Sequence, residues 1–426
     1  MSLQAVSVTP MNLVAVDIES IRIGLPLPFS LRGEGGILLA NKGFVVASRD
    51  DLEWIRGRGL NFYVDVDESD NLMRAFVGKM YELINDEIPL GKIADVRLSS
   101  GDFDLGKQET DDRPDWLNLQ QQCRSLLRDF SPVNSSGAPV YFSDRIDHLQ
   151  ATLSRHSRRN PDGTLFALIH LSATEVRMYS ATHAMLVSVM CGLAAREVLN
   201  WPRELEDRLC KAALTMNIGM TDLQDRLAGQ AESPNATQRQ MIEEHPVRSH
   251  HMLRQLGIND EAWLEAVRDH HTKMPGPLEP RPEGQRMARL IQRADMFAAR
   301  LAPRASRVPI SPAAAMQAAY FDENRKIDEA GAALIKAVGM YQPGSYVRLA
   351  TNEVGVVVRR SASISTPYVA VVINRDGMPT GEPVIRQTSF RENRVLTSVA
   401  HREVKVQIIL ERFLPLTETN PSRRFN

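Results

Sequence analysis

Residues 179–197 have the sequence YSATHAMLVSVMCGLAARE and contain the most apolar segment of the chain, Ala184–Ala195. Apolar side chains recur three and four positions apart in this segment, as in Leu186, Val189 and Leu193, which is the spacing of a helix face. The segment is shorter than the roughly 20 apolar residues that cross a bilayer. We therefore predict a helix that is buried in a protein core and carries His183 near its start.

Helical spacing continues on both sides of this segment, from Trp116 to about Val338. Proline and glycine interrupt it at 160–163, 201–202, 233–235 and 275–282, where breaks between helices are expected. No strand pattern separates the predicted helices, so this region is expected to form an all-α domain.

Both ends of the chain carry strand patterns instead. Short apolar runs separated by turns occur at 14–16, 21–24, 37–39, 44–46 and 62–64, with a short helix expected after Ser48. Runs rich in β-branched residues follow the helical region at 346–349, 354–358, 368–373 and 404–410. Such runs predict small antiparallel sheets. Residues 72–85 have helical spacing, and 98–113 have the polar composition of a loop.

The sequence therefore predicts a multidomain chain with a helical bundle between two small β modules. The expected parts are a β-rich module at 1–68, a helix and linker at 69–115, the helical domain at 116–340 and an antiparallel β module at 341–426.

Composition narrows the classes of function. The 426 residues include 51 Lys and Arg against 52 Asp and Glu, so the basic surplus of a nucleic-acid binder is lacking. Three cysteines without pair spacing argue against a disulfide framework and a cysteine zinc site. Residues 1–10 have neither the basic nor the apolar part of a signal peptide. We expect a cytoplasmic protein with no membrane partner.

Histidine carries the chemical signal of the helical region. A lone histidine on a helix is usually a packed core residue, but here several recur in order across successive predicted helices, together with one aspartate. Helix bundles build metal sites from inward side chains of facing helices. These residues, His183, His245, His270, His271 and Asp295, are therefore candidates for a metal site.

The motifs around these residues resemble the HD-GYP branch of the HD phosphohydrolase superfamily, over roughly 141–343. That family has a Tyr-Ser-x-x-His helix, a His-Asp-Ile-Gly-Lys helix end, a Glu-His-Pro segment, a His-His pair before Gly-Tyr-Pro, and an Ala-Asp helix. The resemblance implies an HD-type bundle with metal ligands at the five residues above. The β modules at both ends resemble modules that often accompany such domains.

The sequence also departs from the family pattern. Met216-Asn217 stand where the His-Asp pair is expected, Met220 replaces the lysine, and Ala298 replaces a second acidic residue of the last helix. After His271, the sequence 272–280 keeps little of the expected acidic and Gly-Tyr-Pro pattern. The resemblance therefore implies a catalytic centre that is at best incomplete.

The bridging position decides which metals can bind. The family's aspartate joins close metal ions, which repel one another and need an anionic bridge, whereas Asn217 is neutral and Met216 offers a soft thioether. One metal position would keep only His183 and Asp295, and the other would keep three imidazoles. We expect one divalent ion (Fe, Mn or Zn) at the three imidazoles, or none, with the histidines packed as neutral core residues.

Basic residues near the last motif helix are candidates for ligand binding, because guanidinium groups recognise phosphate with forked donors. A solvated helix face explains the same pattern. The candidates are Arg289, Arg293, Arg304 and Lys273.

The resemblance implies a role in bacterial cyclic di-GMP signalling. We expect a regulatory, ligand-sensing or partner-binding protein with little or no phosphodiesterase activity. Its partners would be a cyclic dinucleotide, a diguanylate cyclase domain or response regulator, or a second copy of the chain. Two alternatives stay open: a metal-dependent cyclic di-GMP phosphodiesterase with a reduced metal set, and a purely structural dimerisation module.

Overall fold

The computed structural model describes residues 13–16, 27, 30–33, 38–40, 61–65, 114–128, 130, 141–174, 176–301 and 312–418. The chain divides into two compact units, residues 1–113 with 131–140, and residues 114–130 with 141–426. The strands predicted at 21–24 and 44–46, the helix after Ser48, and the helix and loop at 72–85 and 98–113 lie outside the described residues. The domain boundaries near 115 and 340 stay predictions.

The first unit contains an antiparallel sheet in the order β1-β4-β2-β3. Its side chains Val16, Leu31, Phe62 and Val64 are buried. The predicted β-rich character of this unit is therefore confirmed. The strands are β1 (Leu13–Val16), β2 (Leu31–Arg32), β3 (Leu38–Ala40) and β4 (Phe62–Asp65).

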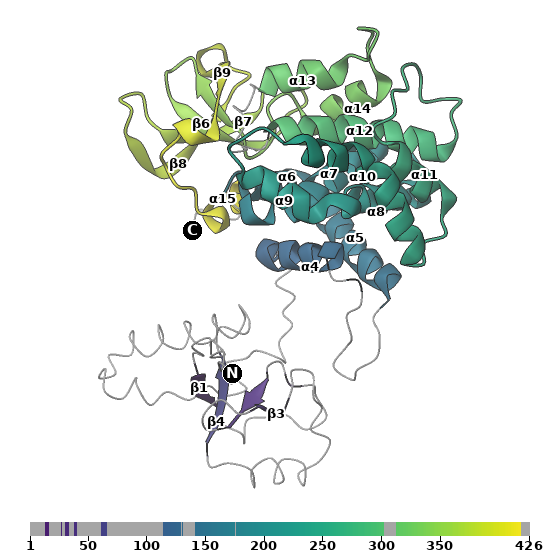
Figure 1. The fold of residues 1–426 in the computed structure, drawn as a ribbon. Helices are drawn as coiled ribbons and strands as arrows, with labels where there is room; N and C mark the ends of the chain where they lie inside the picture. The colour runs from purple at the N-terminus through teal and green to yellow at the C-terminus, as the bar shows by residue number, and fades with distance from the viewer. Residues whose placement is uncertain are drawn as a thin grey trace. The chain divides into compact units, whose positions relative to one another are not determined.

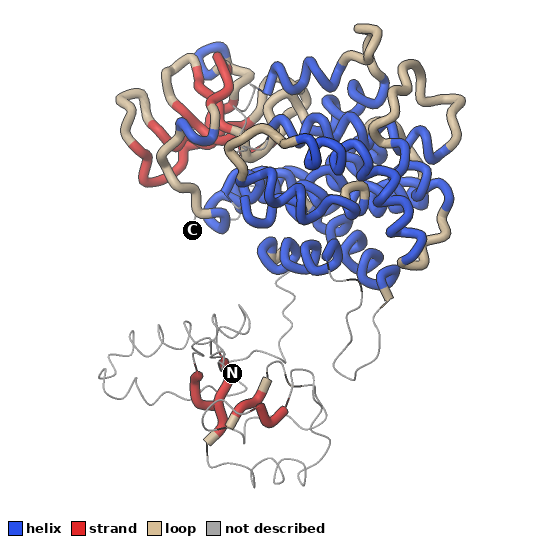
Figure 2. Tube along the Cα trace, viewed as in Figure 1, coloured by secondary structure: helices blue, strands red, loops and turns tan. Residues whose placement is uncertain are grey.

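The second unit begins with the helical domain, as predicted (Figures 1 and 2). Short 3-10 turns, η4 (Val176–Met178) and η5 (Ile218–Met220), precede α7 and α9. The helices are α4 (Trp116–Arg128), α5 (Phe142–Arg159), α6 (Pro161–Thr174), α7 (Tyr179–Glu197), α8 (Arg203–Thr215), α9 (Thr221–Gly229), α10 (Ala236–Gln255), α11 (Glu261–Asp269), α12 (Glu283–Leu301), α13 (Pro312–Tyr320) and α14 (Glu329–Val338).

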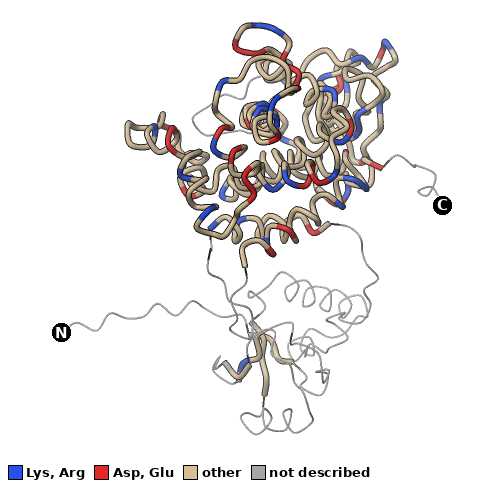
Figure 3. Tube along the Cα trace, turned by 90° about the vertical axis from the view of Figure 1, so that its right-hand side faces the viewer, with Lys and Arg blue, Asp and Glu red and all other residues tan. Residues whose placement is uncertain are grey.

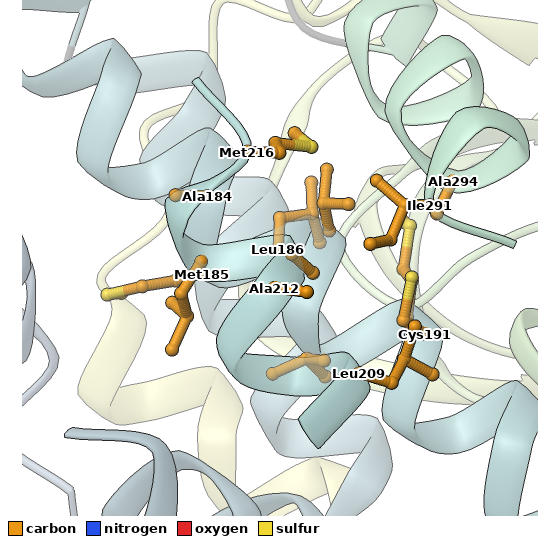
Figure 4. Close-up of a cluster of buried hydrophobic side chains, with 14 of the residues drawn as sticks. Ala184, Met185, Leu186, Cys191, Leu209, Ala212, Met216, Ile291 and Ala294 are labelled. Carbon is orange, nitrogen blue, oxygen red and sulfur yellow. The ribbon is translucent and has the colours of Figure 1, made fainter. Parts of the chain in front are cut away.

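Helix α7 is the centre of this domain. Every residue from Tyr179 to Ala195 is buried, and the helix contacts α4, α5, α6, α8, α9, α12 and α14. A helix that is apolar on all sides has to be surrounded, which confirms the buried helix predicted here. Figure 4 shows part of the surrounding core, where Leu186 and Cys191 of α7 meet Leu209 and Ala212 of α8 and Ile291 of α12.

The C-terminal module is an antiparallel sheet in the order β8-β7-β6-β5-β9. It packs on the helical domain, where the ring of Phe166 in α6 stacks on that of Phe413 with centroids 6.2 Å apart, beside buried Val356 and Ala370. The strands are β5 (Tyr346–Leu349), β6 (Val354–Arg359), β7 (Tyr368–Ile373), β8 (Pro379–Gln387) and β9 (Val395–Val399).

The strand predicted at 404–410 is wrong. Residues 404–409 are irregular, and the short helix α15 (Leu410–Phe413) follows. The apolar side chains of Ile408 and Phe413 are buried in the hydrophobic cluster that includes Phe166. They therefore pack between helix and sheet and take no part in strand pairing. Strand β8 was not predicted, because two prolines and a glycine interrupt its alternation of apolar and polar residues.

Charge and hydropathy agree with this arrangement. Lysine, arginine, aspartate and glutamate are interspersed along the described parts of the helical domain (Figure 3). None of the described helices has both the length and the apolarity that crossing a membrane requires.

Candidate metal centre

Three imidazoles converge between α10 and the end of α11. His245 lies in the middle of α10, His270 is the residue that caps the C-terminus of α11, and His271 follows it. One nitrogen of each lies within 4.8 Å of one nitrogen of the other two. The structure thus brings together three of the residues that the sequence predicts as metal ligands.

Backbone carbonyls orient two of these rings. His245 Nδ1 donates to the carbonyl oxygen of Ile242 at 2.5 Å, and His270 Nδ1 donates to that of Val267 at 2.7 Å. A carbonyl oxygen only accepts hydrogen bonds, so each Nδ1 carries the proton and each Nε2 keeps a lone pair. Metal-binding histidines are commonly fixed in this way.

The sequence explains why these carbonyls are free. Within α10 the carbonyl of Ile242 would normally accept from the backbone N–H of residue 246, but that residue is proline and has none. The carbonyl of Val267 belongs to the last turn of α11, where intrahelical partners run out. The Glu-His-Pro segment therefore supplies a candidate ligand together with the acceptor that orients it, and the sequence pattern alone did not reveal this role.

The two lone pairs face each other. His245 Nε2 and His270 Nε2 lie 3.2 Å apart, and two lone pairs at that distance repel unless a proton or a cation lies between them. Two nitrogens bound to one tetrahedral ion, each at about 2.0–2.1 Å, are separated by about 3.3 Å. The donor set and its spacing therefore fit one ion such as Zn²⁺.

Burial keeps these imidazoles neutral. His245 and His270 are 2% and 0% exposed. Burial lowers the pKa of His245 to about 4 and the pKa of His270 to about 3, and the neutral form is the one that binds metal. His271 is exposed, with its ring centroid 4.2 Å from that of His270. The cluster is therefore buried on the α10 side and open to solvent at His271.

The other two predicted ligands bind each other. His183 Nε2 of α7 donates to Asp295 Oδ1 of α12 at 2.7 Å, and Tyr179 stacks on the His183 ring at a centroid distance of 5.4 Å. Burial alone would raise the pKa of Asp295, but the hydrogen bond from His183 and the nearby imidazoles hold it below its usual range. This pair is already satisfied without a metal.

The bridging segment lies between α8 and α9. Met216 is fully buried in the hydrophobic core (Figure 4), so an apolar residue at this position packs rather than ligates. Asn217 is half-buried and makes no side-chain cap to η5. The N–H of Gly219 donates to Ser249 Oγ of α10 at 3.0 Å, which holds this segment against the helix that carries His245.

The basic candidates for ligand binding are placed differently from one another. Arg289 and Arg293 are buried, and both pair with the buried carboxylate of Asp328, at 2.5 and 3.2 Å. Arg289 also pairs with Glu323 at 2.9 Å. Their donors therefore clamp α12 to the segment before α14, and a ligand contact stays a prediction. Lys273 is exposed, and Arg304 lies outside the described residues.

A separate cavity of about 300 Å³ lies at the junction of the helical domain and the C-terminal module. Its lining includes Arg360, which pairs with Asp162 at 2.6 Å and with Glu197 at 3.2 Å. None of the three clustered histidines lines it, so this cavity is distinct from the candidate metal centre.

The chain is similar to known proteins. Residues 164–331 match the family model described as HD domain. The chain is 24% identical over 267 residues to Cyclic di-GMP phosphodiesterase PA4108 of Pseudomonas aeruginosa, a match that covers 61% of this chain and 62% of that protein. Less than two thirds of the relative's length is therefore matched.

Among solved structures, the chain is similar to Bd1817, a HDG"Y"P protein from Bdellovibrio bacteriovorus. The TM-score is 0.41 with 15% identity, over 76% of this chain and 98% of that one. Shared shape at this level does not carry shared chemistry. Residues 164–331, which form part of the helical domain, are thus similar to the HD domain family.

Proposed function

We propose that this chain is a regulatory or ligand-sensing protein of cyclic di-GMP signalling, with a single divalent ion at His245, His270 and His271 and little or no phosphodiesterase activity. The observation that carries the proposal is the contrast between three converging imidazoles and a neutral residue, Asn217, at the expected bridge. Cyclic di-GMP is proposed because a relative that matches 61% of this chain is named as its phosphodiesterase.

The three-histidine cluster supports binding of one ion. His245 and His270 present Nε2 lone pairs that their own hydrogen bonds cannot use, and exposed His271 leaves the side facing solvent open. A bound divalent ion would supply Lewis acidity toward a phosphate oxygen or a water. A set of three nitrogens with an open fourth position suits either task.

The remaining residues argue against a second ion. His183 and Asp295 satisfy each other, Met216 is packed in the core, and Asn217 cannot become an anion. Without a bridging carboxylate, close metal ions lack the charge that holds them together. General-base catalysis alone is worth roughly two to four powers of ten in rate, so slow or absent turnover is expected.

The test is a measurement of metal content and ligand chemistry on the full chain. We expect one ion per chain after loading with Zn, Mn or Fe, binding of cyclic di-GMP by calorimetry, and no linear dinucleotide product. The His270→Ala variant should lose the ion, whereas His251→Ala, on the exposed side of α10, should keep it. Two ions per chain, with product formation lost in His245→Ala, would establish the phosphodiesterase instead.

A protein partner is the second part of the proposal. We propose that a diguanylate cyclase domain, a response regulator or a second copy of the chain binds this protein. Pull-down with purified domains and the mass of the chain in solution test it. If the chain binds neither dinucleotide nor metal and motif variants behave as wild type, a structural dimerisation module remains.

A further inference from the structure

Arg248 is an exposed arginine on α10, the helix that carries His245. Arg248 follows His245 by three positions on α10, which places it about 60° around the helix axis with its Cβ about 5–6 Å away. His245 is buried and Arg248 is exposed. The arginine side chain therefore starts beside a proposed ligand, where α10 turns from the core toward solvent.

The stem of Arg248 also lies over the bridging segment. Its Cγ is 3.1 Å from the point that a Cβ on Gly219 would occupy, and the backbone nitrogen of Ser249 is 2.9 Å from the same point. Gly219 is two residues after Asn217. Arg248 thus spans the contact between α10, which carries His245, and η5, which follows the bridging position.

The guanidinium of Arg248 has donors to offer. Among the described residues, it has no ion pair within 4.0 Å and no side-chain hydrogen bond. Arg254, on the same helix, pairs with Glu261 at 2.5 Å, and the nearby Glu244 accepts instead from Gln240 at 2.8 Å. A guanidinium that no carboxylate holds can take an anion from solution.

The surrounding charge favours an anion as well. Exposed Lys273 lies two residues after His271, so a second cation borders the cluster from the α11 side. In the interior, the carboxylate of Asp295 accepts from His183, and Asp269 pairs with Arg268 at 2.8 Å. Arg248 and Lys273 are therefore two exposed cations close in sequence to the clustered histidines, whereas Asp295 and Asp269 are engaged in the contacts above.

We propose that Arg248 binds a phosphate group of the ligand at the rim of the three-histidine cluster. Five donors in a rigid fork match two phosphate oxygens at once, which a lysine cannot do. This inference rests on the proposed function, because it places the phosphate of a nucleotide ligand beside the proposed ion. It adds a residue that neither the motifs nor the metal-ligand set includes.

The experiment uses the full chain loaded with Zn²⁺ and compares wild type with Arg248→Ala, Arg248→Lys and the matched control Arg254→Ala. Calorimetry measures the affinity for cyclic di-GMP and, separately, for inorganic phosphate. Loss of a charged hydrogen-bonding group should weaken dinucleotide binding about 10- to 100-fold in Arg248→Ala, and less in Arg248→Lys. Arg254→Ala should bind as wild type does. Metal content should be unchanged in every variant.

The outcomes separate this inference from the proposed function. If wild type binds metal and dinucleotide but Arg248→Ala binds the dinucleotide equally well, the assignment of Arg248 is wrong and the function stands. If wild type takes up no metal or binds neither the dinucleotide nor phosphate, both fail. Weaker phosphate binding in Arg248→Ala supports recognition of the phosphate itself, and an effect on the dinucleotide alone supports recognition of the phosphodiester. Should Arg248→Ala not fold, Arg248→Lys carries the comparison.

Discussion

The histidines in the two halves of the candidate centre make opposite kinds of contact. In the half formed by α10 and α11, the protons of His245 and His270 lie on Nδ1, and their Nε2 atoms face each other 3.2 Å apart. In the half formed by α7 and α12, His183 gives its Nε2 proton to Asp295 at 2.7 Å. The first half has unused Nε2 lone pairs, whereas in the second half the Nε2 of His183 is used in the hydrogen bond to Asp295. The same residue type is therefore poised for a metal in one place and paired with a side chain in the other.

The largest expected effect concerns the buried ion pair between Arg289 of α12 and Asp328. Arg289→Ala leaves the buried carboxylate of Asp328 without its closest cation, and breaking such a pair costs about 3–5 kcal/mol. Denaturant unfolding should show this loss, while metal content per folded chain stays unchanged. Arg254→Ala, which breaks an exposed pair with Glu261, should cost about 0–1 kcal/mol. An equal effect of the two changes would contradict the comparison.

The next effect concerns the half of the candidate centre that is formed by α10 and α11. His270→Ala removes a ligand from the three-nitrogen set, and metal affinity should fall by more than about 100-fold, beyond the effect of losing an outer hydrogen-bonding partner. Calorimetry with Zn²⁺ measures it, and His183→Ala is the matched change in the paired half. The contrast breaks down if His183→Ala removes the ion as completely as His270→Ala does.

A smaller effect is expected from the proline that follows His245. Pro246→Ala restores a backbone N–H that competes for the carbonyl of Ile242, so His245 loses the partner that fixes its ring. Metal affinity should fall about 10- to 100-fold, although the helix itself is not weakened. Unchanged affinity in this variant, measured beside wild type, would show that the carbonyl does not orient the ligand.

The smallest effect is expected at the bridge. Asn217→Asp restores an anion where the family has one, so uptake of a second ion should become measurable by elemental analysis. Hydrolysis of cyclic di-GMP should stay slow, because Met216 remains in the core and Asp295 remains paired with His183. Efficient turnover from this one change would mean that the pair formed by His183 and Asp295 separates more easily than its hydrogen bond indicates.

Much of the fold could be predicted from local pattern. The apolar run in α7 predicts a buried helix, and the β-branched runs in β6 and β7 predict paired strands. The pattern failed at β8, whose prolines and glycine hide its pairing with β7. It also failed at 404–410, where the apolar side chain of Ile408 packs in the cluster around Phe166 and not in a strand. At 404–410 a partner distant in sequence decides the structure, whereas β8 pairs with the strand just before it.

What the sequence by itself determined are properties carried by single residues: the neutrality of Asn217, the missing N–H of Pro246, and the residue types of the candidate ligands. Only the tertiary structure decided which of these side chains face one another. His245 and His270 lie 25 positions apart, and His183 and Asp295 lie 112 apart, so helix packing sets their distances. For the same reason Arg289 is held by Asp328, whereas exposed Arg248 has no ion pair with any residue that the structure describes.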